Sequence, residues 1–302
     1  MMKITEPATN TPTVVPPGSL KPEVTPEKAS QPDKLHQTSV AGASSQMQLL
    51  NLAKQFVLDG GLVSPDKQMP LEDRSRKRER LLNLRKQQNM ENIIQKALAY
   101  CSESEITDKA DQDWFNRFIS LAEEVSNKTM QELWAKILAG EISQPGTFSL
   151  KALKIFRNMS INDAKLLAKA CSLAVKDQGK RNIRIISGSY IQPGLFNFFD
   201  KNREQNINLS HHGLSYADLL TLSENNLLFI QETESSALSK EEQLHFLYNG
   251  SPLDLTAKGN NTIIRFYKFT PVGSELASLI GDNADSKYLG ELKQKLGQHF
   301  RL

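Results

Sequence analysis

Hydrophobic residues recur every three to four positions through the middle of the chain, from about residue 107 to residue 177. The clearest stripes run over residues 114–125 and 133–138, and this spacing places apolar side chains on one face of a helix. Ser149 and Ser160 stand where the caps of two further helices are expected. The pattern therefore predicts a compact helical domain from about residue 71 to residue 177.

One of these expected helices carries signals at both of its ends. Thr129 is followed three residues later by Glu132, which is the form of a capping box. The helix should end near Ile142, because Pro145 and Gly146 follow at the positions that a type II turn favours.

A long helix is expected from about Leu71 to Tyr100. Its second half is amphipathic, with Met90, Ile93 and Ala97 on one side when residues advance by about 100°. Its first half is charged around the whole circumference, which is typical of a helix that is solvated or that extends to a partner. We therefore expect the C-terminal half to be anchored and the first half to project.

After Gly179 the helical spacing gives way to strands. Runs of β-branched and aromatic residues predict strands at residues 181–191, 227–231, 244–248 and 263–269. Helices are expected at residues 214–222, capped by Ser215, and from Pro271, at the first position of its helix. This order resembles a winged-helix module. No Lys or Arg lies between residues 209 and 230, so we expect the module to dock a protein or to dimerise rather than to read DNA.

These patterns divide the chain into four parts. Residues 1–45 hold seven of the thirteen prolines and no aromatic residue, which leaves too little apolar surface to offset the entropy of ordering. We expect a disordered Pro-rich tail over residues 1–45, a helical domain over 46–178, a winged-helix-like α+β module over 179–285 and a C-terminal helix over 286–302. The predicted fold class is mainly α with a smaller α+β C-terminal module.

The positive charge of the chain is concentrated in one short stretch. The chain carries 37 Lys and Arg against 34 Asp and Glu, for a net charge of +3. The stretch Arg74–Lys86, called the basic segment below, contains one acid, Glu79, and seven basic residues: Arg74, Arg76, Lys77, Arg78, Arg80, Arg85 and Lys86. It is either a solvated charge run, a surface for nucleic acid, or a contact for an acidic protein or an anionic membrane. The segment holds no aromatic residue, which argues against base stacking and against membrane insertion.

The sequence motifs of common catalytic sites are absent. The chain contains no glycine-rich phosphate loop, no GxSxG nucleophile motif and no HExxH metal motif. His211 and His212 form the one histidine cluster, and neighbouring side chains of a helix or strand point in different directions. We therefore expect no metal, no cofactor and no catalytic residue.

Cysteine content and hydropathy indicate the compartment. Cys101 and Cys171 are too few for a disulfide framework. The first residues lack the apolar run of a signal peptide, and no window approaches the roughly 18 apolar residues of a membrane-spanning helix. We therefore expect a cytoplasmic protein without a membrane span.

Glu141 is the acidic residue whose role the pattern leaves open. It follows Gly140 at the end of an apolar helix and precedes the turn at Pro145 and Gly146. The interpretation that we favour is a solvated helix end, and the alternative is a carboxylate that points into a groove.

The sequence LWAKILAGEI, followed by PGTFSLKALKIF, resembles the signature of a family of uncharacterised bacterial cytosolic proteins. The likeness covers about residues 71–285 and implies a domain of unknown function. The signature residues that we single out, with a structural role as the expectation, are Trp134, Gly140, Glu141, Pro145 and Gly146. A more remote likeness to abortive-infection domains of the alpha type implies a link to phage defence or stress.

The sequence favours a non-catalytic cytosolic protein with a binding or regulatory role, which contacts an anionic partner through the basic segment. That partner is nucleic acid or an acidic protein, and association into a homo-oligomer is a further option. Two alternatives stay open: a phage-defence or stress effector, and an enzyme that acts on nucleic acid or on a nucleotide.

Overall fold

The computed structural model describes residues 44–101, 111–179, 182–193 and 203–302. The chain separates into two compact units, Met1–Asn51 and Leu52–Leu302. Helix α1 (Ser45–Gln55) begins in the first unit, and the elements described below all belong to the second. The disordered tail predicted for residues 1–45 lies outside the described residues as far as residue 43.

Five helices follow one another in the first half of the second unit, as the hydrophobic spacing predicts. Trp134 lies in their core, with its ring 5.3 Å from the ring of Phe118 and 5.1 Å from the ring of Phe156. All three side chains are buried, so aromatic contacts hold three of these helices together. The five helices are α2 (Leu71–Leu98), α3 (Gln112–Ala122), α4 (Lys128–Ser143), α5 (Leu150–Asn158) and α6 (Ile161–Ser172), and 3-10 turns at Gly60–Leu62 and Pro65–Lys67 precede them.

The helix starts confirm two of the three caps predicted in this region. The Ser149 and Ser160 side chains accept hydrogen bonds from the first turns of α5 and α6. The capping box predicted for Thr129 and Glu132 is wrong. Helix α4 begins two residues earlier than that box requires, and Asn127 accepts from two amides of its first turn. Asparagine ranks above threonine as a cap, which explains the choice.

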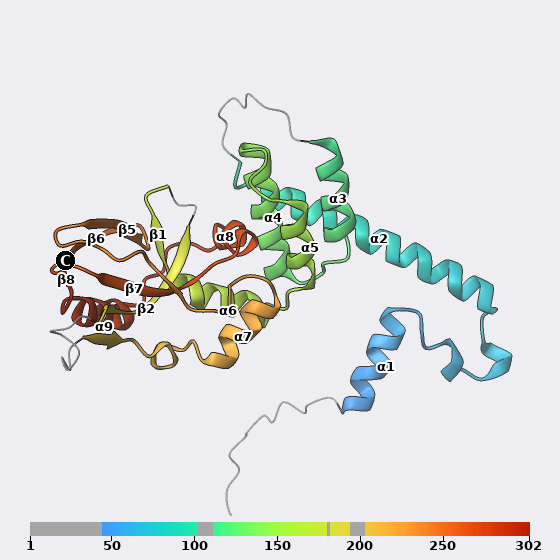
Figure 1. Ribbon diagram of the computed structural model, residues 1–302. Helices are drawn as coiled ribbons and strands as arrows, with labels where there is room; N and C mark the ends of the chain where they lie inside the picture. The colour runs from blue at the N-terminus through green and yellow to red at the C-terminus, as the bar shows by residue number, and fades with distance from the viewer. Residues whose placement is uncertain (1–43, 102–110, 180–181, 194–202) are drawn as a thin grey trace, which may run out of the picture. The chain divides into compact units, whose positions relative to one another are not determined.

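Eight strands in the described part of the chain form one antiparallel sheet (Figure 1). The order across the sheet is β4-β7-β2-β1-β5-β6-β8, and β3 pairs with β2 outside this path. The strands predicted near 181–191, 244–248 and 263–269 are confirmed as β2, β5 and β7. The full set is β1 (Val175–Asp177), β2 (Ile183–Ile191), β3 (Glu204–Asn206), β4 (Thr233–Glu234), β5 (Gln243–Tyr248), β6 (Ser251–Ala257), β7 (Thr262–Lys268) and β8 (Phe300–Arg301).

Several shorter elements differ from the prediction. Residues 227–231 form no named strand, and Leu228 makes a single bridge with Phe269 instead. The predicted C-terminal helix ends at Leu296, after which the chain forms β8 beside β6. Strands β1, β3, β4 and β8 have two or three residues each, too few to show a period. In β6, buried and more exposed residues alternate after Pro252, but a proline is unusual within a strand and obscures this pattern in the sequence.

Three helices accompany the sheet: α7 (Tyr216–Glu224), α8 (Pro271–Ala277) and α9 (Ser286–Leu296), and a 3-10 turn at Leu209–His212 precedes α7. Ser215 and Thr270 cap α7 and α8. Helix α9 lies against β2 and β3 (Figure 1). Its fully buried Tyr288 donates its hydroxyl to the Ile186 carbonyl of β2 at 2.7 Å, which satisfies both polar groups within the core.

A polar cluster joins α6 to the sheet and to α9. Tyr248 of β5 donates its hydroxyl to the Ser172 carbonyl at 2.7 Å and accepts from the Asp285 amide at 3.0 Å. The Asp285 carboxylate caps α9 and binds the Lys169 ammonium at 2.8 Å. These contacts tie the helical half of the unit to its strand-rich half.

Asp285 should make the stability of this junction depend on pH. Partial burial acts to raise the pKa of Asp285, but the Lys169 ammonium and the Tyr288 amide outweigh it and hold the pKa below its usual value of 3.8. A depressed folded-state pKa stabilises the fold above the usual value, and that contribution is lost as pH falls through the folded pKa. Urea unfolding of Asp285→Asn should therefore show a weaker loss of stability below about pH 4 than the unchanged protein. Asp66→Asn, at an exposed site, is the control, and equal slopes for all three proteins would contradict the prediction.

In the described part of the chain, none of the helices combines the length and the apolar character needed to cross a membrane.

Candidate functional site

The basic segment lies on the first half of α2, whose second half is anchored as predicted. Asn89, Met90, Ile93 and Ala97 are the buried residues of this helix, and the helix packs mainly against α4. The half that carries the basic segment extends past α4 and α3 (Figure 1). All the buried residues of α2 therefore lie in its second half, beyond the basic segment.

Two basic residues at the end of the segment serve the fold rather than a partner. Lys86 binds Glu123 at 2.6 Å and Glu124 at 3.5 Å, and the hydrogen bond to Glu123 helps to raise the pKa of Lys86. The guanidinium of Arg85 lies 4.2 Å from the centre of the Phe56 ring, a cation–π distance. Both cations are thus engaged within the second unit.

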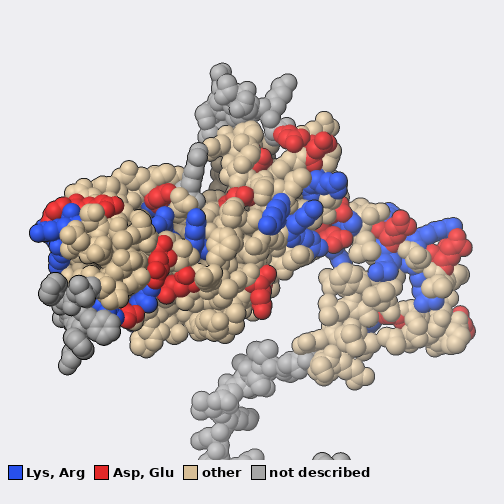
Figure 2. Space-filling view, in the orientation of Figure 1, with Lys and Arg blue, Asp and Glu red and all other residues tan. Residues whose placement is uncertain are grey.

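Two more basic residues of the segment have neighbours of their own. Arg76 binds Glu72 one turn earlier at 2.5 Å, in an exposed pair of small energetic value. Arg74 is half-buried beside Gly60, where a Cβ atom would lie 2.4 Å from the guanidinium. Figure 2 shows basic and acidic side chains next to one another over this end of α2, so the segment is not uniformly positive.

Lys77, Arg78 and Arg80 are the remaining three basic residues, and they are exposed. Within the described residues, none of them has a hydrogen bond or an ion pair. Leu81 and Leu84 are exposed as well, at 39% and 56%. Residues three or four positions apart are neighbours on a helix, so these five side chains form one continuous surface, called the Lys77–Leu84 face below. It combines three free cations with two exposed leucines.

The chain before α2 adds further exposed apolar side chains. Of the nineteen large hydrophobic residues that are exposed in the described part of the chain, eight fall within residues 52–84, and five of these precede α2. Scattered apolar residues on a surface are normal, but a concentration of them marks an interaction site. The sequence analysis did not predict these exposed apolar side chains, because the exposure of a leucine depends on whether another part of the fold packs against it.

The signature residues build the end of α4 and the turn after it. Glu141 is only 3% exposed; its Oε1 accepts from the Gly146 amide at 2.8 Å and its Oε2 from the Phe148 amide at 2.9 Å. Gly146 has φ +86°, as the third residue of a type II turn requires, so the predicted turn is confirmed. The expectation of a solvated helix end at Glu141 is wrong, because this carboxylate is buried and both of its oxygens bind backbone amides.

Gly140 and Trp134 have packing roles in the same region. A Cβ atom on Gly140 would lie 2.9 Å from the Phe148 ring, so glycine allows that ring to lie directly on α4. Trp134 is fully buried in the aromatic core. Pro145 stands in the turn that Glu141 holds. Glu141 and Gly140 therefore place Phe148 against α4, whereas Trp134 contributes to the aromatic core.

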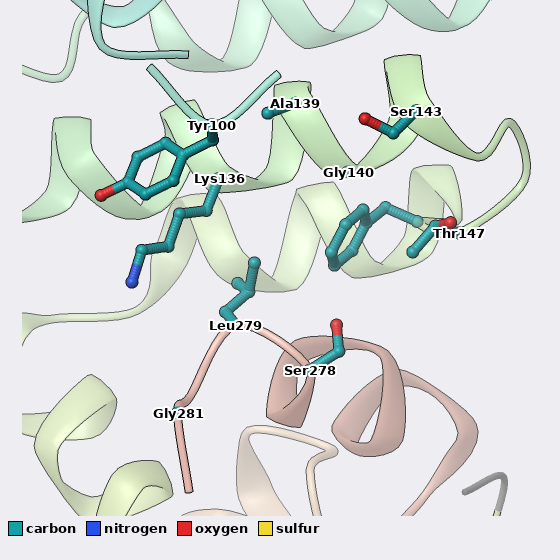
Figure 3. Close-up of a pocket in the computed structure, with 10 residues that line it drawn as sticks. Tyr100, Lys136, Ala139, Gly140, Ser143, Thr147, Ser278, Leu279 and Gly281 are labelled. Carbon is teal, nitrogen blue, oxygen red and sulfur yellow. The ribbon is translucent and has the colours of Figure 1, made fainter. Parts of the chain in front are cut away.

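A pocket of 370 Å³ lies between α4 and the chain just after α8. Figure 3 shows Tyr100 and Lys136 at one end of it, Ser143 and Thr147 at the other, and Leu279 between them. The lining residues, called the signature pocket below, are Tyr100, Lys136, Ala139, Gly140, Ser143, Thr147, Phe148, Ser278, Leu279 and Gly281. Sequence reasoning missed this pocket, because its two walls lie more than a hundred residues apart in the chain.

The candidate acid–base and metal residues of the sequence are engaged in structural contacts. His212 is buried and its Nε2 lies 2.8 Å from a Glu291 oxygen, while His211 contacts Asn208. The two imidazoles do not share a partner. No group of three His, Cys, Asp or Glu side chains among the described residues could hold a metal ion.

A second hollow, of 330 Å³, has a polar lining that sequence reasoning did not find. A β-bulge between Ile186 and Gly188 turns Ser187 toward Glu232, to which it donates at 2.5 Å. Arg265 binds Glu204 at 2.8 Å and approaches Glu232 at 4.0 Å. The charged side chains of this cluster therefore pair mostly with one another.

Comparison with known proteins places the chain in a family. The chain belongs to the family described as "Protein of unknown function (DUF2806)", which matches residues 73–293. This match confirms the expected membership in a domain family of unknown function, and the likeness to abortive-infection domains stays a prediction. Among curated proteins and among solved structures, none matches the chain.

Proposed function

We propose that this member of the DUF2806 family is a non-catalytic binding protein that docks an acidic protein partner through the Lys77–Leu84 face. The observation that carries the proposal is the set of three exposed cations, Lys77, Arg78 and Arg80, which have no ionic partner within the described residues. Such cations attract an acidic surface and guide its approach.

The exposed leucines favour a protein over nucleic acid as the partner. A phosphate backbone is bound by charge and by counterion release, and leucine side chains contribute nothing to either. Leu81 and Leu84 instead fit an amphipathic partner that carries apolar as well as acidic side chains.

Two sets of substitutions should separate the alternatives in affinity purification of the full chain with and without nuclease treatment. The first set reverses charge (Lys77→Glu, Arg78→Glu, Arg80→Glu), and the second removes apolar surface (Leu81→Ser, Leu84→Ser). A protein partner should remain bound after nuclease treatment, and each set should weaken its retention at least about tenfold, because charge and apolar contacts both contribute.

The matched control reverses three other exposed lysines, Lys151, Lys154 and Lys293, and should retain the partner fully. Two outcomes would contradict the proposal. If retention of the partner is lost after nuclease treatment and is unchanged by the leucine substitutions, the partner is nucleic acid instead. Retention that neither set of substitutions changes would exclude this face from binding.

We also propose that residues 179–285, which the sequence predicts to form a winged-helix-like module, have a protein-facing role. Its helix α7 carries exposed Tyr216 and Leu220 and no Lys or Arg, which supports docking or dimerisation over DNA reading. We also propose a cytoplasmic location, which the free cysteines Cys101 and Cys171 support. No specific contact favours the phage-defence or the enzymatic alternative.

A further inference from the structure

We propose that the signature pocket binds a small organic anion whose apolar body carries a hydrogen-bond donor at the end opposite to the anionic group. This inference is independent of the Lys77–Leu84 face, because the pocket uses other residues on another helix. The anionic group would lie at Lys136, the body on Phe148 and Leu279, and the donor at the hydroxyls of Thr147 and Ser278, which line the pocket away from Lys136.

Lys136 is the one charged residue that lines the pocket. Among the described residues, no carboxylate lies within 4.0 Å of its ammonium group, and its recorded contact is with the Tyr100 ring at 5.6 Å. The acid one turn earlier, Glu132, is already bound by Lys96 at 2.7 Å and by the Tyr100 hydroxyl. Lys136 therefore offers a positive charge at the pocket wall that no protein group neutralises by direct contact.

The middle of the pocket is apolar and is held in shape by the signature. Ala139, Phe148 and Leu279 are buried and line the pocket, and Leu279 lies between its two ends (Figure 3). The position of Phe148 is set by the Glu141 carboxylate, which binds its amide at 2.9 Å. The volume of 370 Å³ lies in the range of small-molecule sites, which are lined mostly by apolar groups and a few placed polar ones.

The opposite end of the pocket presents hydrogen-bond acceptors. The Thr147 hydroxyl donates to the Gln144 carbonyl at 2.5 Å, and the Ser278 hydroxyl donates to the Glu275 carbonyl at 2.6 Å. Since both hydroxyl hydrogens are used, the oxygen lone pairs are what remains for a ligand. This end also lies at the C-terminus of α4, where the helix dipole favours positive or donating groups.

Three probes differ by one group each and test these three requirements in solution. They are 4-hydroxyphenylacetate, which meets all three, 4-hydroxyphenylacetamide, which lacks the charge, and phenylacetate, which lacks the donor. We expect 4-hydroxyphenylacetate to bind the full chain in an amide-resolved NMR titration, with shifts centred on residues 136–148 and 278–281. The amide should bind about tenfold more weakly, because it loses the charge-assisted contact.

Lys136→Met should weaken 4-hydroxyphenylacetate binding about tenfold and remove the preference over the amide. Lys154→Met, at an exposed lysine of α5, is the matched control and should bind as the unchanged protein does. Ser278→Trp places a large side chain at the pocket mouth and should abolish binding, while thermal unfolding of each variant shows that the fold is kept.

The proposal is overturned if none of the probes shifts the pocket resonances at probe concentrations up to about 10 times the roughly millimolar Kd expected of such small ligands. It is also overturned if Lys136→Met binds the anion as tightly as the unchanged protein, or if the neutral amide binds equally well. Equal affinity of phenylacetate and 4-hydroxyphenylacetate would overturn the part of the proposal that concerns the donor.

Discussion

Replacing Glu141 by alanine should lower the free energy of unfolding by about 3–5 kcal/mol. The substitution leaves two amides without an acceptor, and the cost of such a buried group is about 1–3 kcal/mol, with more for bonds to charged groups. Both amides belong to the turn after α4, since they are those of Gly146 and Phe148. The loss is measured by urea unfolding followed by fluorescence of Trp114 and Trp134, which both lie in the helical half.

Two further variants make this prediction specific. Glu141→Gln keeps one carbonyl acceptor, so it should lose roughly half as much stability as Glu141→Ala. Glu79→Ala removes an exposed glutamate that has no hydrogen bond or ion pair with the residues that the structure describes, and its effect should stay within about 0.5 kcal/mol. If the free energy of unfolding of Glu141→Ala lies within about 1 kcal/mol of that of the unchanged chain, the turn forms without the carboxylate and the prediction is wrong.

Replacing Gly273 by alanine should have a still larger effect, more than about 4 kcal/mol or loss of the folded state. A Cβ atom there would lie 1.8 Å from the Leu227 carbonyl oxygen and 2.7 Å from its carbon. That carbonyl also accepts from the Thr270 amide at 3.1 Å, so the obstacle is backbone that is already bound to the same helix start. Neither α8 nor the Leu227 backbone can move away without losing the close packing between them.

Gly290 in α9 is the matched control for Gly273. No atom lies within 4 Å of its Cβ position, and glycine in a helix interior is about 0.5–1 kcal/mol less stable than alanine. Gly290→Ala should therefore raise the midpoint of thermal unfolding while Gly273→Ala lowers it sharply. If both substitutions shift the midpoint in the same direction, steric contact with Leu227 does not explain Gly273.

Features encoded by neighbouring residues could be predicted from the sequence. The caps at Ser149, Ser160 and Ser215 are correct, because a cap and the amides that it binds lie within one turn. The same holds for the turn at residues 144–147. The cap of α4 was the exception, since Asn127 and Thr129 both satisfy the local rule, and the helix begins after the asparagine, which ranks higher as a cap.

Features that depend on distant residues could not be predicted. Strand β1 has three residues, and it lies between β2 and β5 because both offer it an antiparallel edge. The role of Glu141 depends on how the chain folds back after the turn, since its acceptors meet amides five and seven residues later. The signature pocket needs residues 278–281 opposite α4, and no local pattern relates these two segments.

The sequence by itself determined that the basic segment is a helix, that it carries seven basic residues and that its packing stripe starts only later. The tertiary structure decided which of those charges are available. Arg85 and Lys86 are engaged by Phe56 and Glu123, far away along the chain, while Lys77, Arg78 and Arg80 have no such partner among the described residues. The physical reason is that charge and helical period are properties of the residues, whereas neutralisation and exposure depend on which distant groups the fold brings within contact distance.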